Sequence, residues 1–289
     1  MFSGSIVALV TPFNDDETVN YNKISELVEW HIANGTNGIL ACGTTGENAT
    51  LSDEEHLEVI NHIVKAVNHR VPVVAGTGSN DTKYSLHLSQ EAEKYGVDAL
   101  LLITPYYLKT SDEGLYRHFA YVADRVKTPI ILYNVPSRTT VNIPIEILKR
   151  LSGHKNIIAI KEAHTETERI LQVAHQCPRL KMFSGNDSQI LPVLSLGGVG
   201  VISVVANIFP KVISDICRLY REGSVAEATA LQVKYAKIMD LLFIEPNPIP
   251  VKEAMNEMGL NVGGFRLPLC AMGVENREIM LAELRVLRS

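Results

Sequence analysis

The chain has 289 residues, of which 46% are hydrophobic and 20% charged, with a formal net charge of −5 at pH 7. This is the composition of a globular protein with enough apolar surface for a core, and it excludes disordered, collagen-like and disulfide-scaffold proteins. Basic residues form no block, so we expect neither nucleic acid nor a membrane surface as a partner.

Short apolar runs rich in β-branched residues recur about every 28 residues along the chain and predict strands. They cover residues 5–10, 38–43, 71–77, 99–105, 129–135, 157–163, 180–186 and 200–206. The runs are apolar throughout instead of alternating, which is typical of parallel strands covered on both faces. Helical patterns lie between them, one beginning at the capping box Ser52-Asp53-Glu54-Glu55 and others at 144–151 and 212–220.

Eight strands that alternate with helices predict an α/β fold, a (β/α)8 TIM barrel over residues 1–224. The rival is a doubly wound sheet, whose G-x-G-x-x-G motif is absent after the first strand. Residues 225–289 carry two helical stripes, at 231–242 and 279–287, and no Gly/Ser-rich linker precedes them. We expect this segment to be a C-terminal helical extension packed on the barrel.

The reacting groups of such barrels lie at the carboxyl ends of the strands, where Lys161 ends the sixth run. Burial beside apolar residues would lower the pKa of its ammonium group, and a neutral amine can attack a carbonyl to form a Schiff base. The alternative is a solvated or paired lysine, with Glu162 as its partner. Successive strand residues alternate faces, however, so Glu162 is expected to point away from Lys161.

Hydroxyl groups and an arginine follow neighbouring strands. Tyr133 could move protons, with Thr44 and Tyr107 extending a relay, or it could simply fill the top of the barrel. The glycine-flanked Thr44-Thr45 loop is either a carboxylate cradle or an ordinary tight turn. Arg138 is either a bidentate carboxylate ligand or a surface residue.

The sequence contains no motif typical of a metal, serine-hydrolase or nucleotide site. The nine histidines form no H-E-x-x-H pattern, and neither G-x-S-x-G nor a Walker motif occurs, so no metal is expected. The N-terminus has no signal-peptide pattern, no apolar run reaches the ~18 residues of a membrane span, and the four cysteines are scattered. These features predict a cytoplasmic protein in a reducing compartment.

Six motifs, in register along nearly the whole chain, resemble the 4-hydroxy-tetrahydrodipicolinate synthase (dihydrodipicolinate synthase) family, within the pyruvate-dependent class I aldolases. They are GTTGE at 43–47, TPYY at 104–107, YNVPSR at 133–138, IKEA at 160–163, EPNPIPVK at 245–252 and RLPL at 266–269. The resemblance implies condensation of pyruvate with L-aspartate 4-semialdehyde to 4-hydroxy-tetrahydrodipicolinate, in the biosynthesis of lysine and diaminopimelate.

The resemblance also implies roles for individual residues. Lys161 would form the imine with pyruvate, so no separate cofactor is needed, and Tyr133 would transfer protons with Thr44 and Tyr107. In the family the tyrosine at the position of Tyr107 comes from a neighbouring subunit, which implies a dimer as the smallest complete unit. The family assembly is commonly a homotetramer, a dimer of dimers, and the same is expected here.

The substrate-binding residues follow in the same way. Thr45, with Thr44, would hold the carboxylate of pyruvate, and Arg138 that of the aldehyde. The backbones of Gly185 and Ile202 would line the pocket.

The chain departs from the family pattern at two places. After Ala163 it reads His164-Thr165 where Thr-Gly is usual, which would reshape the rim of the pocket. The second departure concerns the feedback site for L-lysine, whose positions match Asn48, Ala49, Asp53, His56, Asn80, Tyr84 and Tyr106. Asp53 stands where lysine-sensitive members have a histidine, and Tyr84 replaces the carboxylate that would pair with the inhibitor's ammonium group. We expect weak or absent inhibition by lysine.

Two other functions remain open from the sequence. A sister aldolase that cleaves N-acetylneuraminate or a 2-keto-3-deoxy sugar acid would share Lys161, Tyr133 and the 43–47 loop. Arg138 favours the aspartate semialdehyde reaction over that alternative, because a neutral sugar needs no cation. A non-catalytic ligand-binding barrel is the other possibility, and the joint presence of the lysine and the relay hydroxyls argues against it.

Overall fold

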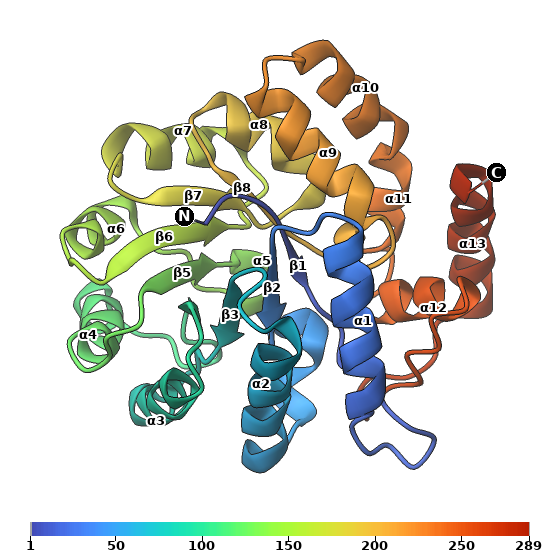
Figure 1. Ribbon diagram of the computed structural model, residues 1–289. Helices are drawn as coiled ribbons and strands as arrows, with labels where there is room; N and C mark the ends of the chain where they lie inside the picture. Colours follow the sequence, from blue (N-terminus) through green and yellow to red (C-terminus); the bar gives the residue numbers. More distant parts are fainter. Residues whose placement is uncertain (1, 289) are drawn as a thin grey trace.

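The computed structural model describes residues 2–288 and contains a closed barrel of eight parallel strands in sequence order (Figure 1). The strands are β1 (Gly4–Ala8), β2 (Gly38–Ala41), β3 (Val73–Gly76), β4 (Ala99–Ile103), β5 (Ile130–Asn134), β6 (Ile157–Glu162), β7 (Lys181–Ser184) and β8 (Gly200–Ser203). β1 pairs with β8 to close the barrel. There a Cβ atom on Gly200 would lie 2.0 Å from the carbonyl oxygen of Gly4, so this close approach requires glycine. The predicted TIM barrel is confirmed.

The strands are buried on both faces, which is why their sequences are apolar throughout. In β5, Ile131 and Tyr133 belong to the cluster inside the barrel, whereas Ile130 and Leu132 belong to the cluster between the barrel and its helices. This alternation follows from the two-residue period of a strand and decides which side chains can reach the mouth of the barrel.

Helices surround the barrel, as Figure 1 shows. Those of the barrel are α1 (Tyr21–Ala33), α2 (Asp53–Val67), α3 (Thr82–Lys94), α4 (Asp112–Ala123), α5 (Pro136–Thr139), α6 (Ile145–Ser152), α7 (Thr167–Gln176), α8 (Ile190–Ser195) and α9 (Pro210–Arg221). The predicted capping box is present at the start of α2, where the Ser52 and Glu55 side chains cap each other's backbone N–H groups. The helices expected at 144–151 and 212–220 are α6 and α9.

Four helices follow the barrel: α10 (Val225–Lys234), α11 (Ala236–Leu241), α12 (Ile249–Glu257) and α13 (Val274–Arg288). The helical stripe at 231–242 is divided between α10 and α11, which separate at Tyr235. α10 packs against α9 and α8, and α13 packs against α11 and α12. Among the described residues, no helix is both long and apolar enough to cross a membrane.

Candidate active site

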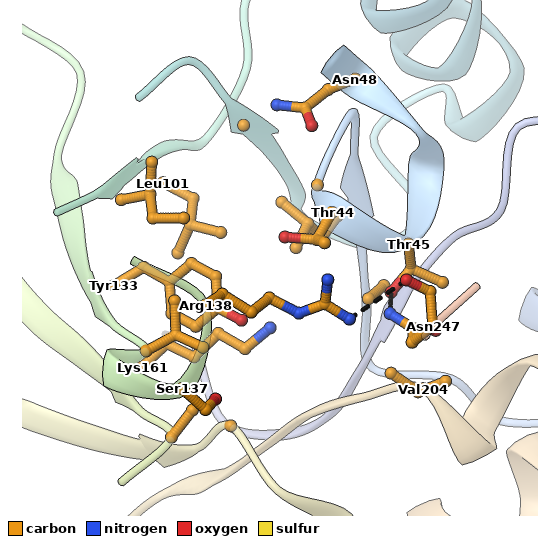
Figure 2. A pocket seen from close by; sticks show the side chains of 18 of the residues that line it. Thr44, Thr45, Asn48, Leu101, Tyr133, Ser137, Arg138, Lys161, Val204 and Asn247 are labelled. Atoms are coloured by element: carbon orange, nitrogen blue, oxygen red, sulfur yellow. Dashed lines mark hydrogen bonds between the residues drawn. The ribbon is translucent and has the colours of Figure 1, made fainter. Parts of the chain in front are cut away.

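A cavity of about 940 Å³ opens at the carboxyl ends of the strands. Residues that follow β2 through β8 line it, together with the segment that joins α11 to α12. Figure 2 shows Lys161, Tyr133, Thr44 and Arg138 around this space. The cavity is large enough for two small substrates at once.

Lys161 is the buried amine of the cavity. It stands on β6 directly opposite Tyr133 of β5, and its Nζ lies 4.3 Å from the centroid of the Tyr133 ring. Burial lowers the pKa of Lys161 to about 7, an effect that the nearby cation of Arg138 reinforces and the carboxylate of Asp187 opposes. A substantial fraction of this amine is therefore neutral, and so nucleophilic, near neutral pH.

Glu162 does not pair with Lys161. Its carboxylate accepts hydrogen bonds from Arg169 Nε (3.1 Å) and Asn134 Nδ2 (2.7 Å). The expectation that Glu162 points away from Lys161 is confirmed. Because its carboxylate is already engaged, Glu162 leaves the amine free to react.

Tyr133 is buried beside the amine. Burial raises the pKa of its phenol to about 12, while the Arg138 cation and the Thr44 side chain act in the opposite direction. At neutral pH the phenol therefore keeps its proton. A phenol that keeps its proton can act as a general acid.

The Thr44-Thr45 loop forms the short 3-10 turn η1 (Thr44–Gly46) at the end of β2. Both threonines line the cavity, and Thr45 is buried. The Thr45 Oγ1 accepts a hydrogen bond from Asn247 Nδ2 over 3.0 Å. The turn thus presents two hydroxyl groups to any ligand beside Lys161.

Arg138 stands in α5, just after β5, on the rim of the cavity. Its Nη2 donates to the backbone carbonyl of Asn247 over 3.1 Å, as the dashed line in Figure 2 marks. The rest of the guanidinium is available to a carboxylate at the mouth of the barrel.

The comparisons with known proteins agree with this geometry. Residues 1–286 match the model of the dihydrodipicolinate synthetase family. A 4-hydroxy-tetrahydrodipicolinate synthase of Clostridium perfringens (strain SM101 / Type A) is 52% identical over 286 residues, which are 99% of this chain and 98% of that protein. The chain belongs to the dihydrodipicolinate synthetase family.

Solved structures of the family superimpose closely. The dihydrodipicolinate synthase of Aquifex aeolicus has a TM-score of 0.97 at 42% identity, covering 99% of this chain and 98% of that one. A chloride-inhibited dihydrodipicolinate synthase of Acinetobacter baumannii, complexed with pyruvate, has a TM-score of 0.96 at 43% identity with the same coverage.

Three further residues predicted from the dihydrodipicolinate synthetase pattern lie in different surroundings. Gly185 lines the cavity, and a Cβ there would come within 2.6 Å of the Ala163 Cβ, so a side chain would not fit. Ile202 is fully buried inside the barrel and is not among the lining residues. Tyr107 is 89% exposed and also lies outside the lining, so the fold of the single chain does not bring it to Lys161.

Most of the residues that the resemblance assigns to a lysine site line the same cavity. Asn48, Ala49, His56, Tyr84 and Tyr106 are among its lining residues, and Asp53 and Asn80 are not. The Tyr84 hydroxyl donates to the carboxylate of Asp53, while His56 Nε2 lies 2.8 Å from the Gly76 carbonyl oxygen. No carboxylate stands at position 84 to receive an ammonium group.

Two residues of the site received no role from the sequence. Asp187 is a buried carboxylate of the cavity lining that accepts hydrogen bonds from the Ser203 hydroxyl and from the N–H groups of Val204 and Val205. Burial raises the pKa of Asp187 in spite of these bonds. Asn247, which links Thr45 to Arg138, lies within the EPNPIPVK motif, but nothing in that motif indicates a contact with residue 45. Among the described residues, no three His, Cys, Asp or Glu side chains gather in a way that could hold a metal ion.

Proposed function

We propose that the chain has 4-hydroxy-tetrahydrodipicolinate synthase activity and condenses pyruvate with L-aspartate 4-semialdehyde through an imine on Lys161. Family membership supports the activity. The observation that carries the mechanism is the buried Lys161, whose pKa is lowered to about 7 at the mouth of a barrel. Arg138 on the rim favours an aldehyde that bears a carboxylate over the neutral sugar aldehydes of sister aldolases.

The proposed reaction passes through an imine and an enamine before the ring closes. The neutral Lys161 amine attacks the ketone carbon of pyruvate and water leaves, giving the imine. Loss of a proton from the methyl carbon converts the imine to an enamine, whose carbon attacks the aldehyde to form the new carbon–carbon bond. The resulting alkoxide takes up a proton. The amino group of the aldehyde substrate then attacks the imine carbon, which closes the ring and releases the lysine.

Proton transfers in these steps are assigned to Tyr133, which lies against the amine and holds its proton at neutral pH. Thr44 of the same chain and Tyr107 contributed by a neighbouring subunit would complete the relay. Thr44 and Thr45 would bind the carboxylate of pyruvate, and Arg138 that of the aldehyde. Gly185 and Ile202 would contribute backbone groups, Gly185 at the lining itself.

The assembly is part of the same proposal. Tyr106, Tyr107 and Leu108 are 40%, 89% and 56% exposed, an apolar stretch that favours burial against a second copy. We infer a dimer as the smallest complete unit and a homotetramer as the full assembly. All four cysteines are free, in keeping with a cytoplasmic location, and the imine lysine serves in place of a cofactor.

The activity is tested by offering the purified chain pyruvate with either L-aspartate 4-semialdehyde or N-acetylmannosamine. The proposal expects condensation with the first aldehyde and none with the second. Turnover of the sugar alone would identify a sister aldolase, and turnover of neither would indicate a binding protein. A Lys161→Ala variant that keeps full activity would contradict the mechanism.

A further inference from the structure

The segment between α11 and α12 lies against the Thr44–Gly46 turn although it is far away in the sequence. Prolines at 246 and 248 restrict its backbone. Just beyond it, the fully buried Lys252 donates from Nζ to Glu47 Oε1 over 2.7 Å and to the carbonyl of Thr11 over 3.2 Å. Glu47 directly follows the turn, so this buried ion pair fixes the segment against it.

Asn247 joins this segment to two residues of the cavity. It is 5% exposed and lines the cavity. Its side-chain Nδ2 donates to Thr45 Oγ1 over 3.0 Å, and its backbone carbonyl accepts from Arg138 Nη2 over 3.1 Å. Among the described residues, the side chain of Asn247 thus hydrogen-bonds only to Thr45, and its backbone carbonyl to Arg138.

The bond to Thr45 decides where the threonine hydroxyl can send its hydrogen. A threonine hydroxyl has one hydrogen to donate and two positions at which it can accept. The amide of Asn247 occupies an accepting position, so the hydrogen stays available. In the part of the chain that the structure describes, the Thr45 hydroxyl makes no other hydrogen bond. This buried donor therefore lacks an acceptor at the wall of the cavity.

We propose that Asn247 is a positioning residue, which holds the hydroxyl of Thr45 as a donor toward the carboxylate of the 2-oxo acid substrate. The inference rests on the proposed function, because it assigns that carboxylate to the Thr44–Gly46 turn. It adds a residue of the C-terminal segment to the determinants of specificity. A 2-oxo acid would be selected over an uncharged ketone partly through a hydroxyl whose direction Asn247 sets.

Asn247→Ala and Asn247→Asp give different results if this is correct. Removal of the amide lets the hydroxyl turn away, and KM for pyruvate is expected to rise about tenfold. KM for the aldehyde should change less than about twofold, because the carbonyl that holds Arg138 belongs to the backbone. The isosteric aspartate takes the Thr45 hydrogen for itself and repels the substrate carboxylate, so KM for pyruvate should rise by about a hundredfold or more.

A double-mutant cycle with Thr45→Val separates positioning from a general structural effect. If Asn247 acts through the hydroxyl, Asn247→Ala causes no further rise in KM for pyruvate once Thr45 is valine. Independent, additive effects would overturn the proposal, and so would an aspartate variant no worse than the alanine variant. Circular dichroism and the melting temperature check folding. Asn247→Asp preserves the shape of the side chain and serves if the alanine variant does not fold.

The outcome for the wild-type chain keeps the two proposals apart. If it fails to condense pyruvate with the aldehyde, the proposed function fails. If it condenses them and both Asn247 variants keep the wild-type KM for pyruvate, the positioning role alone is wrong. A cavity-forming control in α9, Ile216→Ala, is buried away from the turn and should lower the melting temperature without changing the ratio of the two KM values.

Discussion

Lys161→Met should make the protein more stable at neutral pH, because burial of the ionisable Lys161 amine lowers the free energy of unfolding. Burial lowers the pKa of Lys161 from 10.5 to about 7. Between these two values the unfolded chain binds more protons than the folded chain, so this group makes wild-type stability rise as the pH increases. The ionisation cost in the folded state is about 4 kcal/mol at pH 7 and about 1 kcal/mol at pH 10. Methionine has a similar shape and does not titrate.

The assay is urea unfolding followed by far-ultraviolet circular dichroism at both pH values and one protein concentration. The free energy of unfolding of Lys161→Met should exceed that of the wild type by several kcal/mol at pH 7, with an advantage about 3 kcal/mol smaller at pH 10. Lys127→Met, at an exposed position, is the matched control and should change little at either pH. An advantage of the same size at both pH values, or none at pH 7, would refute the claim that burial sets the pKa of Lys161.

Three further predictions concern the reaction and its control. Asp187→Asn removes the charge that opposes the lowering of the Lys161 pKa, so the acid limb of kcat/KM for pyruvate should move below its wild-type position near pH 7; a move upward would contradict this. Tyr133→Phe removes a proton donor but no ligand of the pyruvate carboxylate. In steady-state kinetics, kcat should therefore fall by about a hundredfold or more, with little change in KM for pyruvate. Lysine at submillimolar concentration should leave activity unchanged, because Tyr84 stands where the family resemblance leads us to expect a carboxylate in lysine-sensitive members, and its hydroxyl engages Asp53. Clear inhibition in the steady-state assay would show that another group holds the ammonium.

The barrel could be predicted from the sequence because each strand is marked by a short apolar run of its own. The runs are apolar throughout, as expected of parallel strands covered on both faces, and each of the eight observed strands ends before its predicted end. The predicted strands are too long because the apolar runs continue past the point where the chain leaves the barrel. Cys42 and Gly43 continue the apolar run after β2 but lie in the bend that leads into the Thr44–Gly46 turn.

The central pair of the site was equally accessible from the sequence. Lys161 and Tyr133 end adjacent runs, and adjacent parallel strands bring their carboxyl ends together. Asn247 could not be found in this way, because its contact with Thr45 spans 202 residues and depends on the packing of the C-terminal segment. Asp187 is similar, since only the fold surrounds its carboxylate with Ser203 and the N–H groups after β8.

The central claim is that Lys161 forms a covalent imine with pyruvate. Incubation of the wild-type chain with pyruvate and borohydride, followed by peptide mass spectrometry, tests it most directly. A reduced pyruvate adduct should appear on Lys161 and be absent from Lys161→Met. No adduct, or one confined to a different lysine, would contradict the claim.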